Sequence, residues 1–172
     1  MTVLDIDVMV DVAPPYEDRI DVDLVTRAAR AAVLAASRDE AAGLPANLHP
    51  ENPADVDIRI TDDREMQDLN STFRGVDRPT DVLSFSFLDG PSEHDASLPP
   101  EMPVHLGDIA ISYPYVERQA HELGHAADKE LAWLTIHGML QILGYSHDTD
   151  ETARHMEGLE QIALESLAMS GD

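Results

Sequence analysis

The segment His137-Gly-Met-Leu-Gln-Ile-Leu-Gly-Tyr-Ser-His147 places two histidines around the end of an apolar helix. His137 and Gln141 are four residues apart, so their side chains lie on one face of a helix. Gly144 can adopt the left-handed conformation that ends a helix, and the residues after it can bring His147 back toward the same face. Two neutral imidazoles that converge are suitable ligands for a divalent transition metal. The segment therefore predicts a metal site.

The third metal ligand in this prediction is a weak one. Gln141 offers a neutral amide oxygen, and Asp148 or a second water are alternative donors. An ion with one open position lowers the pKa of its bound water to about 7, and the resulting hydroxide attacks esters and amides. The pattern thus predicts metal-dependent hydrolysis, with Zn²⁺ as the Lewis acid. The alternative is a structural role for His137, in which the buried ring bonds to a carbonyl.

Gly138 is an unusual residue for the middle of this predicted helix. Residues 131–143 are apolar almost all round, which predicts a buried helix. A glycine in such a helix costs about 1 kcal/mol relative to alanine. We therefore expect another backbone or a substrate to approach closely at Gly138.

Periodicity elsewhere in the chain predicts an α+β fold. Strands are expected at residues 3–12, 56–60, 82–87 and 106–111. Helices are expected at about residues 23–37, 62–73, 115–123, 128–143 and 150–168, with Asp23 and either Thr61 or Asp62 as the first two caps. Residues 89–103 are rich in proline and predict an irregular loop. Strands come first and helices later, so we expect one α+β domain over residues 1–172.

Composition restricts the function further. The chain has no cysteine, which excludes disulfides and thiolate metal sites. Its N-terminus does not look like a signal peptide and no apolar run could span a bilayer, so we expect a cytoplasmic protein without membrane contact. The formal charge is −23, from 34 acidic and 11 basic side chains, which argues against a general nucleic-acid coat. A local nucleic-acid site would have to use arginines, because Lys129 is the only lysine.

Arg74 is the arginine that we single out. It lies at a predicted helix-to-turn junction just before a strand, and a guanidinium fork suits phosphate better than an ammonium does. Arg78 is a weaker candidate of the same kind. The alternative for both is a surface ion pair with a carboxylate. Ser84 and Ser86 are interpreted as strand packing.

A second motif, His121-Glu-Leu-Gly-His125, fits the HExxH pattern of zinc peptidases. In that chemistry Glu122 would be the general base and a distant residue such as Glu151 the third ligand. However, Gly124 and the cap-like Asp128 indicate that one helix stops and another starts here. The two histidines would then not share a helix face. A metallopeptidase is therefore the least favoured of the functions considered.

Five segments together resemble the YbeY family of endoribonucleases and rRNA maturation factors. They are residues 69–75 (LNSTFRG), 79–85 (PTDVLSF), 106–112 (LGDIAIS), 124–125 (GH) and 137–147 (HGMLQILGYSH). The resemblance covers about residues 55–165, and the first fifty residues match only in outline.

The resemblance implies a zincin-like fold, with a four-stranded mixed sheet packed with about five helices, and one Zn²⁺ held by three histidines of the pattern HGxLHxLGYDH. His137 and His147 match the outer two ligands, whereas the middle ligand falls on Gln141 and the preceding Asp on Ser146. The family's RNA-binding arginine falls on Arg74, and its Gly-His pair at residues 124–125 is not a ligand. His137 and Arg74 are thus the expected catalytic residues; Arg74 is the expected RNA-binding residue, together with Arg78 as the weaker candidate given by its position.

The implied function is a metal-dependent single-strand endoribonuclease that acts in maturation of the 16S rRNA 3′ end and in ribosome quality control. Its partners would be ribosomal RNA and ribosomal or assembly proteins. Because Gln141 replaces a ligand, the alternative is a weakened or inactive ribosome-assembly or RNA-binding factor with the same fold.

Overall fold

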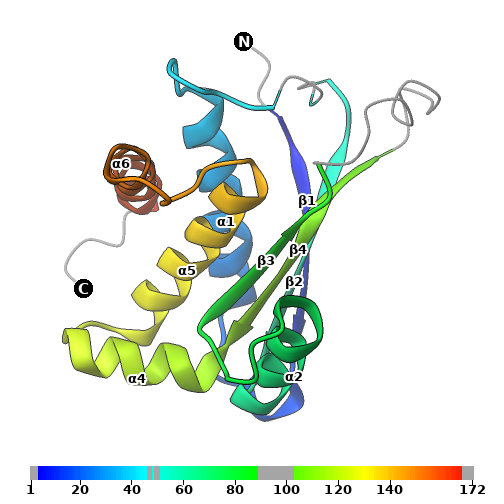
Figure 1. Ribbon diagram of the computed structural model, residues 1–172, viewed down its shortest axis with the longest axis vertical. Helices are drawn as coiled ribbons and strands as arrows, with labels where there is room; N and C mark the ends of the chain where they lie inside the picture. Colours follow the sequence, from blue (N-terminus) through cyan, green and yellow to red (C-terminus); the bar gives the residue numbers. More distant parts are fainter. Residues whose placement is uncertain (1–3, 46–47, 49–50, 89–102, 168–172) are drawn as a thin grey trace.

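The computed structural model describes residues 4–45, 48, 51–88 and 103–167 (Figure 1). The fold is α+β, as predicted. Its strands are β1 (Ile6–Val12), β2 (Ala54–Thr61), β3 (Val82–Ser86) and β4 (Val104–Ser112). Its helices are the short 3₁₀ helix η1 (Pro14–Tyr16), α1 (Val22–Ser37), α2 (Asp63–Arg74), α4 (Tyr113–Leu123), α5 (Ala127–Ile142) and α6 (Asp150–Ser166). Within the described ranges, none of the helices has the length and apolar character needed to cross a bilayer.

The four strands form one mixed sheet in the order β1-β2-β4-β3. β1, β2 and β4 are parallel, and β3 is antiparallel to β4. Alternation decides which face of each strand is buried. Val56, Ile58 and Ile60 of β2 are almost completely buried, whereas Asp57 between them is exposed. The mixed four-stranded sheet predicted from the sequence is therefore confirmed.

Helices cover the two faces of the sheet unequally (Figure 1). α1, α5 and α6 lie on one side of it, and α2 lies on the other, where it packs on β4. α5 contacts β3, β4, α1, α4 and α6, which explains why its sequence is apolar almost all round. Side chains, rather than another backbone, approach Gly138: a Cβ there would lie 3.2 Å from Ile109 Cγ2 and 3.4 Å from Val82 Cγ2.

Element ends differ slightly from the sequence-based expectation. Asp21, not Asp23, caps α1, because its carboxylate accepts a hydrogen bond from the Leu24 backbone N–H at 3.3 Å. Of the two expected caps of α2, Asp62 is the one used. α4 begins two residues earlier than predicted, after the cap Ser112. The predicted loop at residues 89–103 lies outside the described residues except at its last position.

A β-bulge interrupts β4 near its start. Asp55 pairs with His105 but Val56 pairs with Gly107, so Leu106 is an extra residue in β4. A Cβ on Gly107 would lie only 2.3 Å from the backbone oxygen of Phe85 on β3. The bulge therefore requires glycine at this position.

We predict that Gly107→Ala lowers the free energy of unfolding by roughly 2–4 kcal/mol, because β3 and β4 must separate to admit the methyl group. Gly158→Ala is the matched control, since Gly158 lies within α6 and a Cβ there meets nothing within 4 Å. That control should raise the free energy by up to about 1 kcal/mol through helix propensity. Urea unfolding followed by circular dichroism measures both, and equal effects of the two substitutions would contradict the prediction.

Candidate metal and nucleic-acid site

Two adjoining pockets on the α5 side of β3 contain most of the predicted site residues. One pocket, of about 490 Å³, is lined by Arg74 and by the turn after α5. The other, of about 550 Å³, is lined by His137 and by α6. Val82, Gln141 and His147 line both pockets. The candidate cleft thus runs from the end of α2, past Gln141 and His147, to His137.

His137 projects from α5 with a fixed ring orientation. Its ring stacks on Trp133 at a centroid distance of 5.2 Å, and its Nδ1 lies 2.5 Å from Glu160 Oε2. The Glu160 side chain is only 4% exposed. Because a carboxylate only accepts hydrogen bonds, Nδ1 carries the proton and Nε2 is left with its lone pair. A carboxylate behind a histidine in this way is the usual arrangement for an imidazole that binds a metal.

His147 reaches the same cleft from the turn after α5. Gly144 has a φ of +106°, which allows the chain to reverse as predicted. The His147 ring then lies 5.5 Å from that of His137, measured between centroids. Two imidazoles bound to one zinc at about 2.1 Å and a tetrahedral angle have ring centres roughly 5 Å apart. The observed separation is compatible with a shared ion.

A carboxylate just after α1, with a side chain only 6% exposed, holds this turn in place. Tyr145 donates its hydroxyl hydrogen to Asp39 Oδ2 at 2.6 Å, and His155 Nε2 lies 2.9 Å from the same oxygen. Burial alone would raise the pKa of Asp39, but these two hydrogen bonds, with those from backbone N–H groups, hold it well below its ordinary value. Burial and the adjacent Asp39 carboxylate raise the pKa of the Tyr145 hydroxyl. Asp39 therefore stays ionised and anchors the turn that carries His147.

Gln141 lies between the two pockets and bonds to β3. The Ser84 hydroxyl donates to Gln141 Oε1 at 2.7 Å, and the neighbouring Ser86 donates to the Ile142 carbonyl at 2.8 Å. The serines that we interpreted as strand packing thus fix the end of α5 on the sheet. A carbonyl oxygen has two lone pairs, so one lone pair of Oε1 is still free.

The donor set is compatible with a divalent ion held by two imidazoles. The Nε2 of His137 is free, the two rings have a suitable separation, and the Gln141 oxygen can add a weak neutral ligand. Asp148 lines the Arg74 pocket and stays an alternative donor. The assignment of His137, Gln141 and His147 as ligands stays a prediction.

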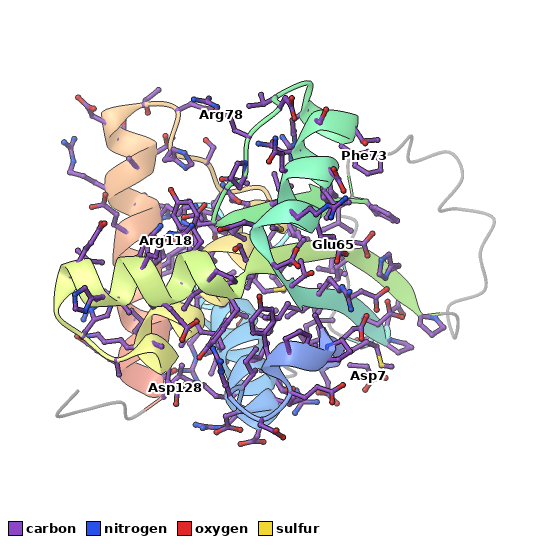
Figure 2. The ribbon with its side chains drawn as sticks, turned by 90° about the horizontal axis from the view of Figure 1, so that it is seen from below. Asp7, Glu65, Phe73, Arg78, Arg118 and Asp128 are labelled. Carbon is purple, nitrogen blue, oxygen red and sulfur yellow. The ribbon has the colours of Figure 1, made fainter. Side chains whose placement is uncertain are left out.

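Arg74 lies at the open end of the cleft. Its Nη2 donates to the Ser84 carbonyl at 2.7 Å, and its guanidinium lies over the Phe85 ring at 5.2 Å. No carboxylate in the described ranges is within ion-pair distance of it, so the alternative of a surface ion pair is not what is found. Arg78 is exposed in the turn after α2 (Figure 2) and does not line either pocket.

The HExxH motif does not form a zinc site. α4 ends at Leu123 because Gly124 takes the left-handed conformation, with a φ of +73°, as predicted from the sequence. His125 thus follows the helix that carries His121. Its Nε2 lies 2.9 Å from Oε1 of the buried Glu130. The spacing that a metallopeptidase needs on one helix is absent.

Sequence reasoning missed the three side chains that support the site: Glu160, Ser84 and Asp39. Glu160 could have been identified from the sequence, because it falls on the apolar face of α6 together with Met156, Leu159 and Ala163. An acidic residue on a buried face requires a partner, and His137 is that partner. Ser84 and Asp39 gave no comparable signal, because their partners are 57 and 106 residues away in the chain.

We predict that Glu160→Gln weakens zinc binding by roughly 10- to 100-fold, because the neutral amide no longer fixes the tautomer of His137. Competition with a chromophoric chelator measures the affinity. Glu165→Gln, at an exposed position of the same helix, is the control and should leave the affinity unchanged. If both variants bind zinc as the parent protein does, Glu160 does not orient a metal ligand.

Comparisons with known proteins identify the family of the chain. The family model "Endoribonuclease YbeY" matches residues 20–168. The chain is similar to the endoribonuclease YbeY of Roseiflexus castenholzii, at 41% identity over 96% of this chain and 97% of that protein. It is also similar to that of Chloroflexus aurantiacus, at 49% identity over 83% and 84%. The solution structure of TM1509 from Thermotoga maritima shares the fold, with a TM-score of 0.55 and 20% identity over 96% and 94% of the two chains. The chain therefore belongs to the endoribonuclease YbeY family.

Proposed function

We propose that this protein is a metal-dependent endoribonuclease that cleaves single-stranded RNA during ribosomal RNA maturation, including that of the 16S 3′ end, and in ribosome quality control. Its partners in this proposal are ribosomal RNA and ribosomal or assembly proteins. The observation that carries it is the shared cleft: Gln141 and His147 line both the pocket of Arg74 and the pocket of His137. A phosphate held at one end therefore lies close to the paired imidazoles.

Each side chain has a defined part in the proposed reaction. Arg74 donates hydrogen bonds to a phosphate oxygen, and the Ser84 carbonyl and the Phe85 ring keep its guanidinium in place. His137 and His147 would hold one Zn²⁺, with Glu160 fixing the ring of His137 and Gln141 as the weak third donor. The ion supplies Lewis acidity toward the scissile phosphodiester. Ser84 keeps Gln141 against the sheet, so the amide cannot swing across the cleft.

The test separates binding from cleavage with two variants. Arg74→Ala should weaken binding of a single-stranded rRNA oligonucleotide about 10-fold. Because one phosphate contact is lost, the slope of log binding constant against log salt concentration should become shallower by about 0.7. His137→Ala should leave binding within about threefold but reduce cleavage at least about 100-fold. Fluorescence anisotropy measures binding, and denaturing gels measure cleavage by protein purified without chelator.

Arg64→Ala is the control for the arginine variant, because Arg64 is exposed on the same helix and lines neither pocket. Its RNA affinity should equal that of the parent protein. Cleavage by the parent protein should stop on treatment with a chelator and return on addition of Zn²⁺. Cleavage that persists in His137→Ala would contradict the proposed site.

One observation favours a second candidate function, an RNA-binding or ribosome-assembly factor without hydrolytic activity. The middle position of the histidine set is the neutral Gln141, whose oxygen already accepts a hydrogen bond from Ser84. This candidate predicts RNA binding that depends on Arg74, no zinc in the purified protein and no cleavage with any added metal.

We predict that Gln141→His raises the affinity for zinc by at least about 10-fold, because imidazole is a stronger donor than an amide oxygen. The affinity compared is that of the zinc ion whose binding is lost when His147→Ala is added to the same protein. Gln161→His, on the exposed face of α6, controls for the added histidine and should not change that affinity. An unchanged affinity in Gln141→His would mean that residue 141 does not face the ion.

A further inference from the structure

Another histidine with carboxylate partners, His105, lines neither pocket of the cleft. His105 on β4 is half-buried, and its neighbours are Asp55 and Asp57 on β2 and Asp108 on β4. This cluster lies on the face of the sheet opposite α5, the same face that carries α2. Nothing in the proposed nuclease reaction uses it.

The bulge in β4 brings these side chains together. In a regular strand, residues three apart such as His105 and Asp108 point to opposite faces of the sheet. The extra residue Leu106 reverses the alternation, so both point to the face of Asp55 and Asp57. The bulge in turn depends on Gly107, for the steric reason given above. The local sequence therefore builds this cluster at a position where ordinary pairing would separate it.

The geometry of the cluster matches a metal-binding histidine with a supporting carboxylate. Asp55 Oδ1 lies 2.5 Å from Nδ1 of His105, as Glu160 does for His137. One ligand atom each of Asp57, His105 and Asp108 lie within 4.8 Å of one another. Asp108 Oδ1 is the nearer of the two carboxylates, 2.9 Å from His105 Nε2.

We propose that Asp57, His105 and Asp108 form a second metal site, specific for a divalent transition metal ion. One imidazole and two carboxylates suit Mn²⁺, Fe²⁺, Co²⁺ or Zn²⁺. Asp55 remains on Nδ1 and orients the ring, while Nε2 releases to solvent the proton that it shares with Asp108 and binds the ion in its place. Three protein ligands leave coordination positions for water or for an external ligand.

The ion has access to this site from solvent. Asp57 and Asp108 line an open groove of about 860 Å³ on this face of the sheet. The groove also contains the exposed rings of Phe73, at the end of α2 (Figure 2), and Phe87. The ring of Phe87 lies edge-on to that of His105 at 4.9 Å and covers one side of it. The site is thus sheltered on one side and open on the other.

The experiment uses the full chain with His147→Ala, so that the proposed nuclease site does not contribute to the signal. Titration calorimetry with Zn²⁺ should give one ion per chain. Adding His105→Gln or Asp108→Asn should weaken this binding at least about 10-fold. Mn²⁺ should broaden the backbone NMR signals of residues 55–57 and 105–108 in the His147→Ala protein but not in its His105→Gln derivative.

Asp7→Asn is the matched control. Asp7 is exposed and lies opposite Asp55 in the pairing of β1 with β2. Its replacement by Asn removes the same charge as Asp108→Asn does, but it does not remove a proposed ligand. Its zinc affinity should change less than threefold. Absence of binding in the His147→Ala protein, or binding that His105→Gln and Asp108→Asn leave unchanged, overturns the proposal and leaves His105 as a structural clamp between carboxylates. Circular dichroism checks that each variant is folded.

Discussion

The close contact between α5 and the sheet at Gly138 is the constraint on which the cleft depends. Because this residue has no side chain, the helix lies directly against Ile109 and Val82. That distance brings the end of α5 within hydrogen-bond reach of β3, where Ser84 and Ser86 bond to it. A helix held further from the sheet would lose both bonds. Gly138 lowers the helix propensity of α5, but the close approach that it allows fixes the position of every site residue on this helix.

Buried carboxylates then fix the site from the side opposite the sheet. Glu160 on α6 holds the ring of His137, and Asp39 at the end of α1 holds Tyr145 in the turn that precedes His147. Both carboxylates are paired with hydrogen-bond donors, as burial of a charge requires. Ser84 on the sheet, Glu160 on α6 and Asp39 after α1 thus support the same cleft from three sides of α5.

Much of the fold could be predicted from periodicity and glycine positions. The strands, the five long helices and the helix stop at Gly124 were all expected, and that stop correctly argued against the HExxH motif. The order of the strands, the bulge at Leu106 and the partner of Gln141 could not be predicted, because they depend on which distant segments pack together. Glu160 lies between these cases, because its place on an apolar helix face indicated a buried partner without identifying it.

The low pKa of Asp39 has a consequence for how acid acts on this protein. A carboxyl whose pKa is depressed in the folded state stabilises it above the ordinary pKa of aspartate, and this stabilisation is lost only as the pH falls toward the depressed value. The Tyr145 turn therefore stays tethered to Asp39 through mild acidification, and only strong acid releases it.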